Sequence, residues 1–354
     1  MTDADDDLPI PLPAVEAMPA YARSRDPVPL LVRVKAEGMR LDHYIHVFFK
    51  DSSRSELQKA IVAGNVTVNG QPSKASYKVR NDDQLMVQLP DRVNDVIVPE
   101  NIPITVLYED DRLAVIDKPM DMVVHPARGN WTGTLVNALA FRFADHLSKA
   151  NGNYRLGIVH RLDRDTTGAI LIAKDDEAHA FLSSQFEKRT VFKEYVALVA
   201  GELDRDSDYI EVAIRQHPHD REKQAVALNP DDPEAKPACS YYEVMERFRG
   251  YTLVKVQPRT GRTHQIRVHL QYIGCPVLSD KLYGGRNCFR RSDLVPGIPH
   301  PADDVTYLIR QALHAFRLRF RHPTTNSYIE VEAPLAADIR AALLAIREHR
   351  PYRG

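Results

Sequence analysis

Two aspartates lie two residues apart in the stretch GIVHRLDRDTTGAILIAK, which runs from residue 157 to residue 174. A carboxylate in such a stretch can bind a divalent cation, act as a nucleophile or base, or form an ion pair that closes a turn. We expect strands at GIVHRL and AILIAK, which places Asp163 at a strand end, a rigid position for a reactive group. Arg164, between Asp163 and Asp165, disfavours a cation. Spacing alone therefore favours the ion-paired turn.

A second polar cluster, RTGRTHQIRVHL, carries Arg259, Arg262 and Arg267 around the start of a helix predicted over residues 261–274. An arginine can hold a carboxylate through two parallel N–H bonds and keep it ionised at neutral pH. An aspartate held in this way beside a pocket is a candidate nucleophile or base, not a general acid. His264 and His269 are five residues apart, so they lack the i, i+4 spacing of a helical zinc site.

Tyr195, in the strand-like stretch KEYVALVAG, is a third candidate. Because it alternates with Ala197 and Val199, it fits a core position. A tyrosine ring in a pocket can equally stack on a nucleobase and present its hydroxyl group. The sequence contains neither G-x-x-x-x-G-K-[ST] nor G-x-G-x-x-G, so it supports no nucleotide cofactor.

These residues belong to a chain of 354 residues, which is long enough for two or three domains. Charged residues make up 27% of it, and no apolar run approaches the roughly 20 residues that span a bilayer. The acidic start does not resemble a signal peptide, and the three cysteines are irregularly spaced, so we expect reduced thiols in a cytoplasm. Residues 1–30, with six acidic and two basic residues, are expected to form a disordered tail.

Residues 31–90 predict a small module of two helices and a hairpin. The apolar residues of MRLDHYIHVFF recur at i, i+3, i+4 and i+7, which is the spacing of one helix face. DSSRSELQKAIVAG predicts a second helix, and VTVNGQP predicts a hairpin that turns at Asn-Gly. We interpret the polar residues 91–103 as a linker.

Residues 104–345 predict a larger domain in which strand patterns outnumber helix patterns and most strands connect as hairpins. We therefore expect an α+β fold, with a mixed, mainly antiparallel β-sheet and flanking helices, preceded by the small α/β module. Besides the helix at residues 261–274, the predicted helices are GTLVNALAFRF, DEAHAFLSSQFEKR and LAADIRAALLAIREH.

The order RLDHYI, SRSELQKAIVAGNVTVNG and NDDQL makes the small module resemble the S4 RNA-binding domain. GIVHRLDRDTTGAILIAK, KEYVALVAG and TGRTHQIRVHL, followed by PVLSDKLYGG, resemble in this order the RluA/RluD family of RNA pseudouridine synthases. The S4-bearing, RluD-like branch is the most similar. The resemblance runs from about Arg40 to Arg340.

The resemblance implies a cytoplasmic isomerase that converts uridine to pseudouridine, usually in large-subunit (23S) ribosomal RNA, without a cofactor or metal. It implies no membrane association and no obligate protein partner, and we expect a monomer. By the same resemblance Asp163 is the catalytic aspartate and Arg267 pairs with it. Tyr195 is the tyrosine that stacks on the target base and is also a candidate base in catalysis. Further residues are expected in the substrate pocket (His160, Arg161, Arg262 and His264) and in RNA binding by the small module (Arg40, Arg54 and Lys59).

Two other classes of protein remain as alternatives. A non-catalytic S4-bearing protein that binds or assembles ribosomes would have no need of the complete set formed by Asp163, Tyr195 and Arg267. A metal-dependent nuclease would use Asp163 together with Asp165, and its activity would be lost in EDTA or on replacement of Asp165.

Overall fold

The computed structural model describes residues 24–49, 52, 54–89, 97–126, 130–152, 154–298 and 300–352. The chain divides into two compact units, residues 1–93 and residues 94–354. Most of the expected disordered tail, and residues 91–96 of the expected linker, lie outside the described residues.

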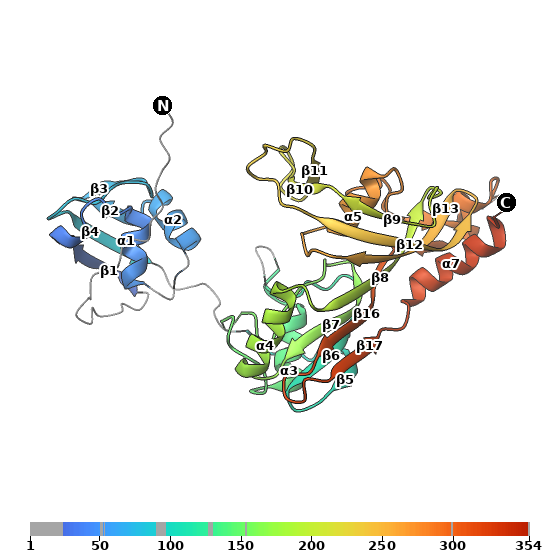
Figure 1. The fold of residues 1–354 in the computed structure, drawn as a ribbon, viewed down its shortest axis with the longest axis horizontal. Coiled ribbons are helices and arrows are strands. Elements are labelled where there is room, and N and C mark those ends of the chain that lie inside the picture. Colours follow the sequence, from blue (N-terminus) through green and yellow to red (C-terminus); the bar gives the residue numbers. More distant parts are fainter. Residues whose placement is uncertain are drawn as a thin grey trace. The chain divides into compact units, whose positions relative to one another are not determined.

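The N-terminal unit packs two helices on a four-stranded sheet (Figure 1). The apolar positions of the first predicted helix, including Leu41 and Ile45, are buried in its core. The predicted hairpin forms because Asn69 and Gly70 both adopt left-handed backbone conformations, with φ of 52° and 78°. Its elements are β1 (Ser24–Leu31), α1 (Leu41–Phe48), α2 (Arg54–Val62), β2 (Val66–Val68), β3 (Gln71–Pro72) and β4 (Gln84–Leu89), with a short 3₁₀ turn at Val34–Ala36.

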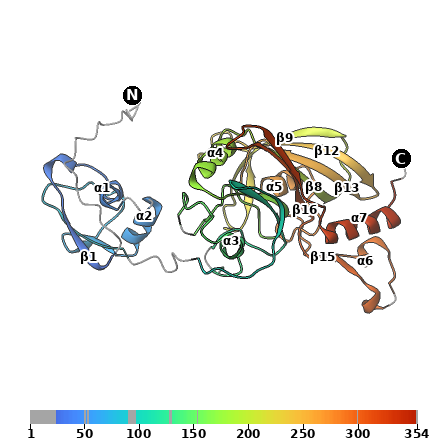
Figure 2. The ribbon, with the colours of Figure 1, turned by 90° about the horizontal axis from the view of Figure 1, so that it is seen from below.

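The second unit is built on one large twisted sheet (Figures 1 and 2). Within the described residues, β7 and β16 are its parallel pair and the other neighbours are antiparallel, which confirms the prediction of a mixed, mainly antiparallel α+β fold. In spatial order the strands are β5 (Thr105–Glu109), β6 (Leu113–Lys118), β7 (Thr167–Ala173), β16 (Leu313–Arg321), β8 (Phe192–Ala200), β13 (Tyr251–Pro258), β12 (Cys239–Phe248) and β9 (Ser207–Glu211), while β17 (Tyr328–Glu332) pairs with β16.

Helices flank this sheet, and two short strand pairs lie outside it. Each helix predicted in this unit is present within its stretch: α3 (Leu135–Phe143), α4 (Asp176–Glu187), α5 (Gln265–Tyr272) and α7 (Ala337–His349). The remaining elements are β10 (Ala213–Gln216), β11 (Gln224–Ala227), β14 (Phe289–Arg290), α6 (Arg291–Leu294), a 3₁₀ turn at Pro301–Asp303 and β15 (Thr306–Leu308).

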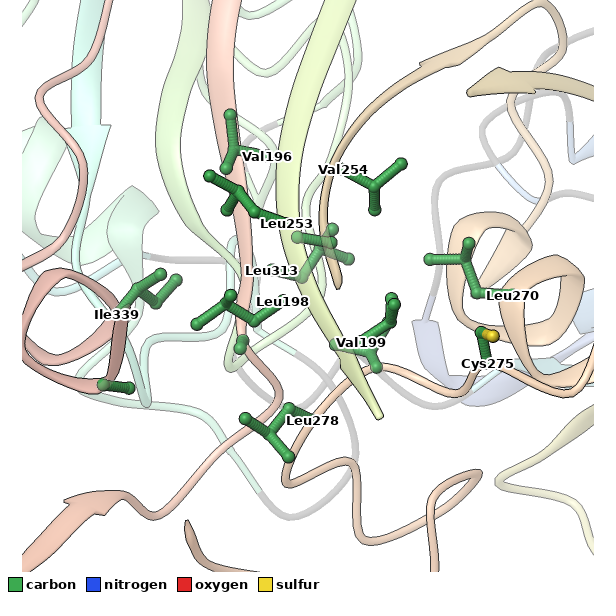
Figure 3. Close-up of a cluster of buried hydrophobic side chains, with 14 of the residues drawn as sticks. Val196, Leu198, Val199, Leu253, Val254, Leu270, Cys275, Leu278, Leu313 and Ile339 are labelled. Carbon is green, nitrogen blue, oxygen red and sulfur yellow. The ribbon is translucent and has the colours of Figure 1, made fainter. Parts of the chain in front are cut away.

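The largest hydrophobic core joins the central strands to helices on both sides (Figure 3). Val199 of β8 and Val254 of β13 are fully buried there, together with Leu270 of α5 and Ile339 of α7. Burying side chains of this size stabilises the fold by roughly 1.5–3 kcal/mol each. This core fixes β8, β13 and α5 relative to one another, and these elements carry much of the site described below.

The expected strand at GIVHRL is wrong. In this stretch Ile158 makes only an isolated bridge to Ile172, and the rest is irregular. Ile158 and Leu162 are buried in a core cluster and do not form a strand alongside β7. Asp163 therefore lies in a loop that precedes β7, not at a strand end. Gly168 lets β7 begin directly after that loop, since a Cβ there would lie 2.3 Å from the carbonyl oxygen of Ala315.

Candidate active site

A cavity of about 430 Å³ opens where the loop before β7 meets β8 and the start of α5. It contains every pocket and catalytic residue expected from the sequence. Residues more than 100 positions apart in the chain are thus brought together by the sheet and by the packing of α5 upon it. The expected residues among its lining are His160, Arg161, Asp163, Tyr195, Arg262, His264 and Arg267.

Asp163 and Arg267 are in direct contact. The Nη1 of Arg267 donates to Oδ2 of Asp163 at 3.2 Å. The two parallel N–H bonds that arginine can make go to a different carboxylate: Nε and Nη2 of Arg267 donate to Asp280 at 2.6 and 2.9 Å. Asp280 is fully buried and Arg267 is 4% exposed, so Asp280 fixes the guanidinium, which then presents Nη1 to Asp163.

Electrostatics reinforce this arrangement. Burial alone would lower the pKa of Arg267, but the hydrogen bonds and charge of Asp280, together with Asp163, raise it overall. The guanidinium also lies 5.0 Å from the ring centre of Tyr283. Arg267 is therefore a permanent, positioned cation beside the Asp163 carboxylate, whose side chain remains 21% exposed to the cavity.

Tyr195 comes from β8, where it pairs with Val256 of β13 and Ala315 of β16. It is partly buried and lines the cavity, so it does not fill a closed core position. Burial raises the pKa of the phenol, and the nearby Asp163 carboxylate raises it further. Its hydroxyl group is accordingly protonated at neutral pH.

His264 precedes the first turn of α5 in a left-handed conformation, with φ of 54°. Its Nδ1 makes a 2.9 Å hydrogen bond with the hydroxyl group of Tyr283, and its Nε2 lies 3.8 Å from Oδ2 of Asp163. Burial lowers its pKa, although Asp163 acts in the opposite direction. The helix thus starts later than predicted, and Arg262 and His264 lie in the turn before it.

His160 has a structural role that the sequence did not indicate. Its Nε2 accepts a 2.8 Å hydrogen bond from the backbone N–H of Leu171, and its ring stacks on Phe186 at 4.4 Å. Burial, together with Lys193, lowers the pKa of His160 to about 3. A neutral imidazole therefore ties the loop to β7. Arg161, by contrast, is exposed at the cavity.

Two buried basic side chains that sequence reasoning missed hold the Asp163 loop in place. Lys118 is fully buried at the end of β6 and donates to the carbonyl oxygens of Pro119, Met122 and Arg164 at 2.7, 2.9 and 2.8 Å. Arg310 donates to the carbonyl oxygen of Asp165 at 2.9 Å while binding Asp338 through two bonds. The backbone directly after Asp163 is consequently fixed by distant elements.

In the N-terminal unit, two of the three expected RNA-binding residues are engaged within the protein. Asp42 is fully buried and accepts hydrogen bonds from Arg40 at 3.0 Å, from Arg54 at 3.3 Å and from Gln58 at 2.6 Å. Burial opposes ionisation of Asp42, but these donors lower its pKa overall. Arg40 and Arg54 stay 40% and 51% exposed, and Lys59 is exposed.

Within the described residues, no three His, Cys, Asp or Glu side chains come together in a group that could hold a metal ion. Asp163 and Asp165 are therefore not part of such a group. Every helix in the same ranges is too short or too polar to cross a lipid bilayer. The site is therefore a cavity with one positioned carboxylate, a fixed arginine, a protonated tyrosine and a basic rim.

Comparison with known proteins gives two matching family models: RNA pseudouridylate synthase over residues 112–272 and the S4 domain over residues 39–85. The chain is 39% identical over 310 residues to an uncharacterised RNA pseudouridine synthase of Bacillus subtilis, covering 88% of this chain and 95% of that protein. It is 40% identical over 321 residues to ribosomal large subunit pseudouridine synthase D of Nitrosomonas europaea, covering 90% of this chain and 88% of that protein.

Solved structures show the same fold. The human protein RNA pseudouridylate synthase domain containing 1 matches with a TM-score of 0.51 and 24% identity, over 72% of this chain and 98% of its own. The human protein RNA pseudouridylate synthase domain containing 4 matches with a TM-score of 0.52 and 25% identity, over 68% of this chain and 92% of its own.

Proposed function

The chain belongs to the RNA pseudouridylate synthase family, which isomerises uridine to pseudouridine in RNA, and on this premise we propose that its substrate is large-subunit ribosomal RNA. The proposal is supported by relatives named ribosomal large subunit pseudouridine synthase D, which include a Haemophilus ducreyi protein 37% identical to this chain. We further propose that it acts in the cytoplasm, as a monomer, without an obligate protein partner or a cofactor.

We propose Asp163 as the catalytic residue. The single observation that carries this assignment is the 3.2 Å bond from the fixed guanidinium of Arg267 to Oδ2 of Asp163, inside a cavity that also holds Tyr195. An arginine so placed aims the carboxylate into the cavity. A carboxylate of this kind can attack C1′ of the ribose or take the proton from C2′, and either event cleaves the N1–C1′ bond.

The remaining steps need no change of oxidation state. Cleavage releases uracil with the bonding electrons on N1, and the base turns within the cavity. A bond then forms between C5 and C1′ as Asp163 leaves C1′ or, in the second route, returns its proton to C2′. The C5 proton is transferred to N1 through a base. The target uridine must leave its helix or loop to reach Asp163, so base flipping precedes these steps.

Tyr195 is assigned the stacking role on the flipped base. Its ring lines the cavity beside Asp163, and stacking on a base contributes about 1–3 kcal/mol. Because burial raises the pKa of its phenol, Tyr195 would first have to lose a proton before acting as a base at C5. Stacking therefore accounts for its position better than proton abstraction.

We assign RNA docking to the N-terminal unit, through Arg40, Arg54 and Lys59. Their exposed positive charges suit contacts with backbone phosphates. The substrate is tested by chemical mapping of pseudouridines in ribosomal RNA from cells with and without the gene. Loss of one or more pseudouridines in large-subunit RNA, restored by the wild-type gene, is the expected result. An unchanged large-subunit map would contradict the substrate assignment.

A further inference from the structure

The cavity extends from Asp163 toward Lys193 and Arg189, neither of which has a part in the chemistry above. Lys193 lies on β8 two residues before Tyr195, so both side chains point to the same face of the sheet. It is partly buried. Across the described residues its ammonium group has no hydrogen bond and no carboxylate within ion-pair distance. Leaving a partly buried cation unpaired is unfavourable unless a ligand supplies the counter-charge.

Arg189 is the second cation at this end of the cavity. It follows the C-terminus of α4 and has a φ of 58°, a left-handed conformation that normally favours glycine. The described residues offer it no carboxylate partner either. Arg189 and Lys193 line the same end of the cavity, and burial together with the charge of Arg189 lowers the pKa of Lys193. An anion between them would relieve the repulsion between their charges.

The space in front of Lys193 is kept open by Gly261. A Cβ built on Gly261 would lie 4.0 Å from Nζ of Lys193 and meet no other atom within that distance. The backbone of Gly261 does not need a left-handed conformation, so its lack of a side chain matters for space, not for φ. Apart from Asp163, the only carboxylate among the residues that line the cavity is Glu187, which is exposed.

Resting on the function proposed above, we infer that Lys193, Arg189 and Gly261 form a phosphate subsite that binds a backbone phosphate flanking the uridine held against Tyr195. The two cations supply the charge and Gly261 leaves the approach open. The subsite holds the strand while the base is turned in the adjacent space, so it contributes to binding and positioning. It takes no part in bond cleavage.

The test uses the full-length protein and an unmodified large-subunit rRNA transcript. Lys193→Met keeps an unbranched apolar stem of similar length and removes the charge, while Arg189→Gly removes the other cation and suits the left-handed backbone. Lys188→Met is the matched control, because Lys188 is an exposed lysine in the same segment that does not line the cavity. RNA affinity is measured over a series of salt concentrations, and pseudouridine formation is followed to obtain kcat and KM.

We expect each cavity variant to raise KM with little change in kcat, because contact with an unreacting phosphate is equal in the ground and transition states. Each should also reduce the slope of log K against log salt by about 0.7, the value for one contact to a single strand. Lys188→Met should match the wild type. Arg189→Gly should not lower the Tm, which separates loss of binding from loss of folding.

A second measurement locates the phosphate. In RNA fragments that carry the mapped target uridine, a neutral methylphosphonate linkage on one side of it should weaken wild-type binding. It should weaken binding by Lys193→Met less, because that variant has already lost one of the two cations of the subsite. Wild-type salt slopes in both cavity variants, or a fall in kcat with an unchanged slope, would overturn the inference. If the wild type itself forms no pseudouridine in this transcript, the substrate assignment fails instead.

Discussion

Arg267 binds Asp280 through Nε and Nη2 and binds Asp163 through Nη1. Arg267, which orients the proposed catalytic carboxylate of Asp163, is thus itself oriented by a second, fully buried carboxylate. The backbone N–H groups of Leu282 and Tyr283 also donate to Asp280, so the chain from Asp280 through Arg267 to Asp163 is anchored on rigid backbone.

Replacing Asp280 should therefore impair both folding and catalysis. Asp280→Asn removes the charge that faces the buried guanidinium, and breaking a buried pair typically costs about 3–5 kcal/mol of stability. Among molecules that remain folded, we expect kcat to fall because Arg267 no longer presents Nη1 correctly. Denaturant unfolding and single-turnover pseudouridine formation measure the two effects. Full activity in the folded variant would show that Asp280 does not position Arg267.

Lys118→Met should weaken the loop that carries Asp163. The variant keeps the apolar stem and loses three hydrogen bonds, which leaves the carbonyl oxygens of Pro119, Met122 and Arg164 without this donor. An unsatisfied buried polar group costs about 1–3 kcal/mol. We expect a lower Tm and a lower kcat with RNA affinity preserved. A Tm equal to that of the wild type would argue against the loop-holding role.

We expect His160 to make the folded protein less stable in acid. The folded protein keeps this imidazole neutral down to a pKa of about 3, whereas the unfolded chain binds a proton below about 6.5. The unfolded state therefore binds more protons in this window, and stability falls as the pH is lowered from 6.5 toward 3.

His160→Gln offers a comparison, because its amide oxygen can accept the Leu171 N–H without titrating. The difference in unfolding free energy between wild type and variant should change by at most roughly 1.4 kcal/mol per pH unit through that window. Parallel stability curves from pH 7 to pH 4 would refute the assignment of a neutral, partly buried His160.

In the N-terminal unit, we expect Lys59 to serve RNA binding alone, and Arg40 and Arg54 to serve both RNA binding and stability. Lys59→Ala should weaken RNA binding and reduce its salt dependence while leaving stability unchanged, since Lys59 is exposed and removal of a phosphate contact lowers the slope. Arg40→Ala and Arg54→Ala should also lower the Tm, because each removes a partner of buried Asp42. Equal stability in all three variants would contradict the Asp42 cluster.

Much of the fold could be predicted because its elements carry their own local signals. The spacing of Leu41 and Ile45, and the Asn-Gly turn at residue 69, report on neighbours within a few residues. The strand expected at GIVHRL was wrong because a short apolar run fits a core-packed irregular segment as well as a strand. The S4-like match at residues 39–85 covers the helices and hairpin but not β1.

Of the candidate site, the sequence could predict the residues that lie in family motifs but not the residues that hold them in place. The family motifs pointed to Asp163, Tyr195 and Arg267, and the structure brings these three together in one cavity. Asp280 and Lys118 were missed because a buried ion or a lysine bonded to carbonyl groups has no signature in neighbouring residues. Their partners lie in other elements, so only the packed fold identifies them.

The central claim is that Asp163 carries the chemistry while the rest of the cavity binds and orients RNA. The most direct measurement compares purified wild type, Asp163→Asn and the control Asp165→Asn for RNA affinity and for single-turnover pseudouridine formation. We predict that Asp163→Asn binds RNA nearly as well as the wild type and forms no product, while Asp165→Asn forms product. Pseudouridine formation by Asp163→Asn at the wild-type rate would contradict the account.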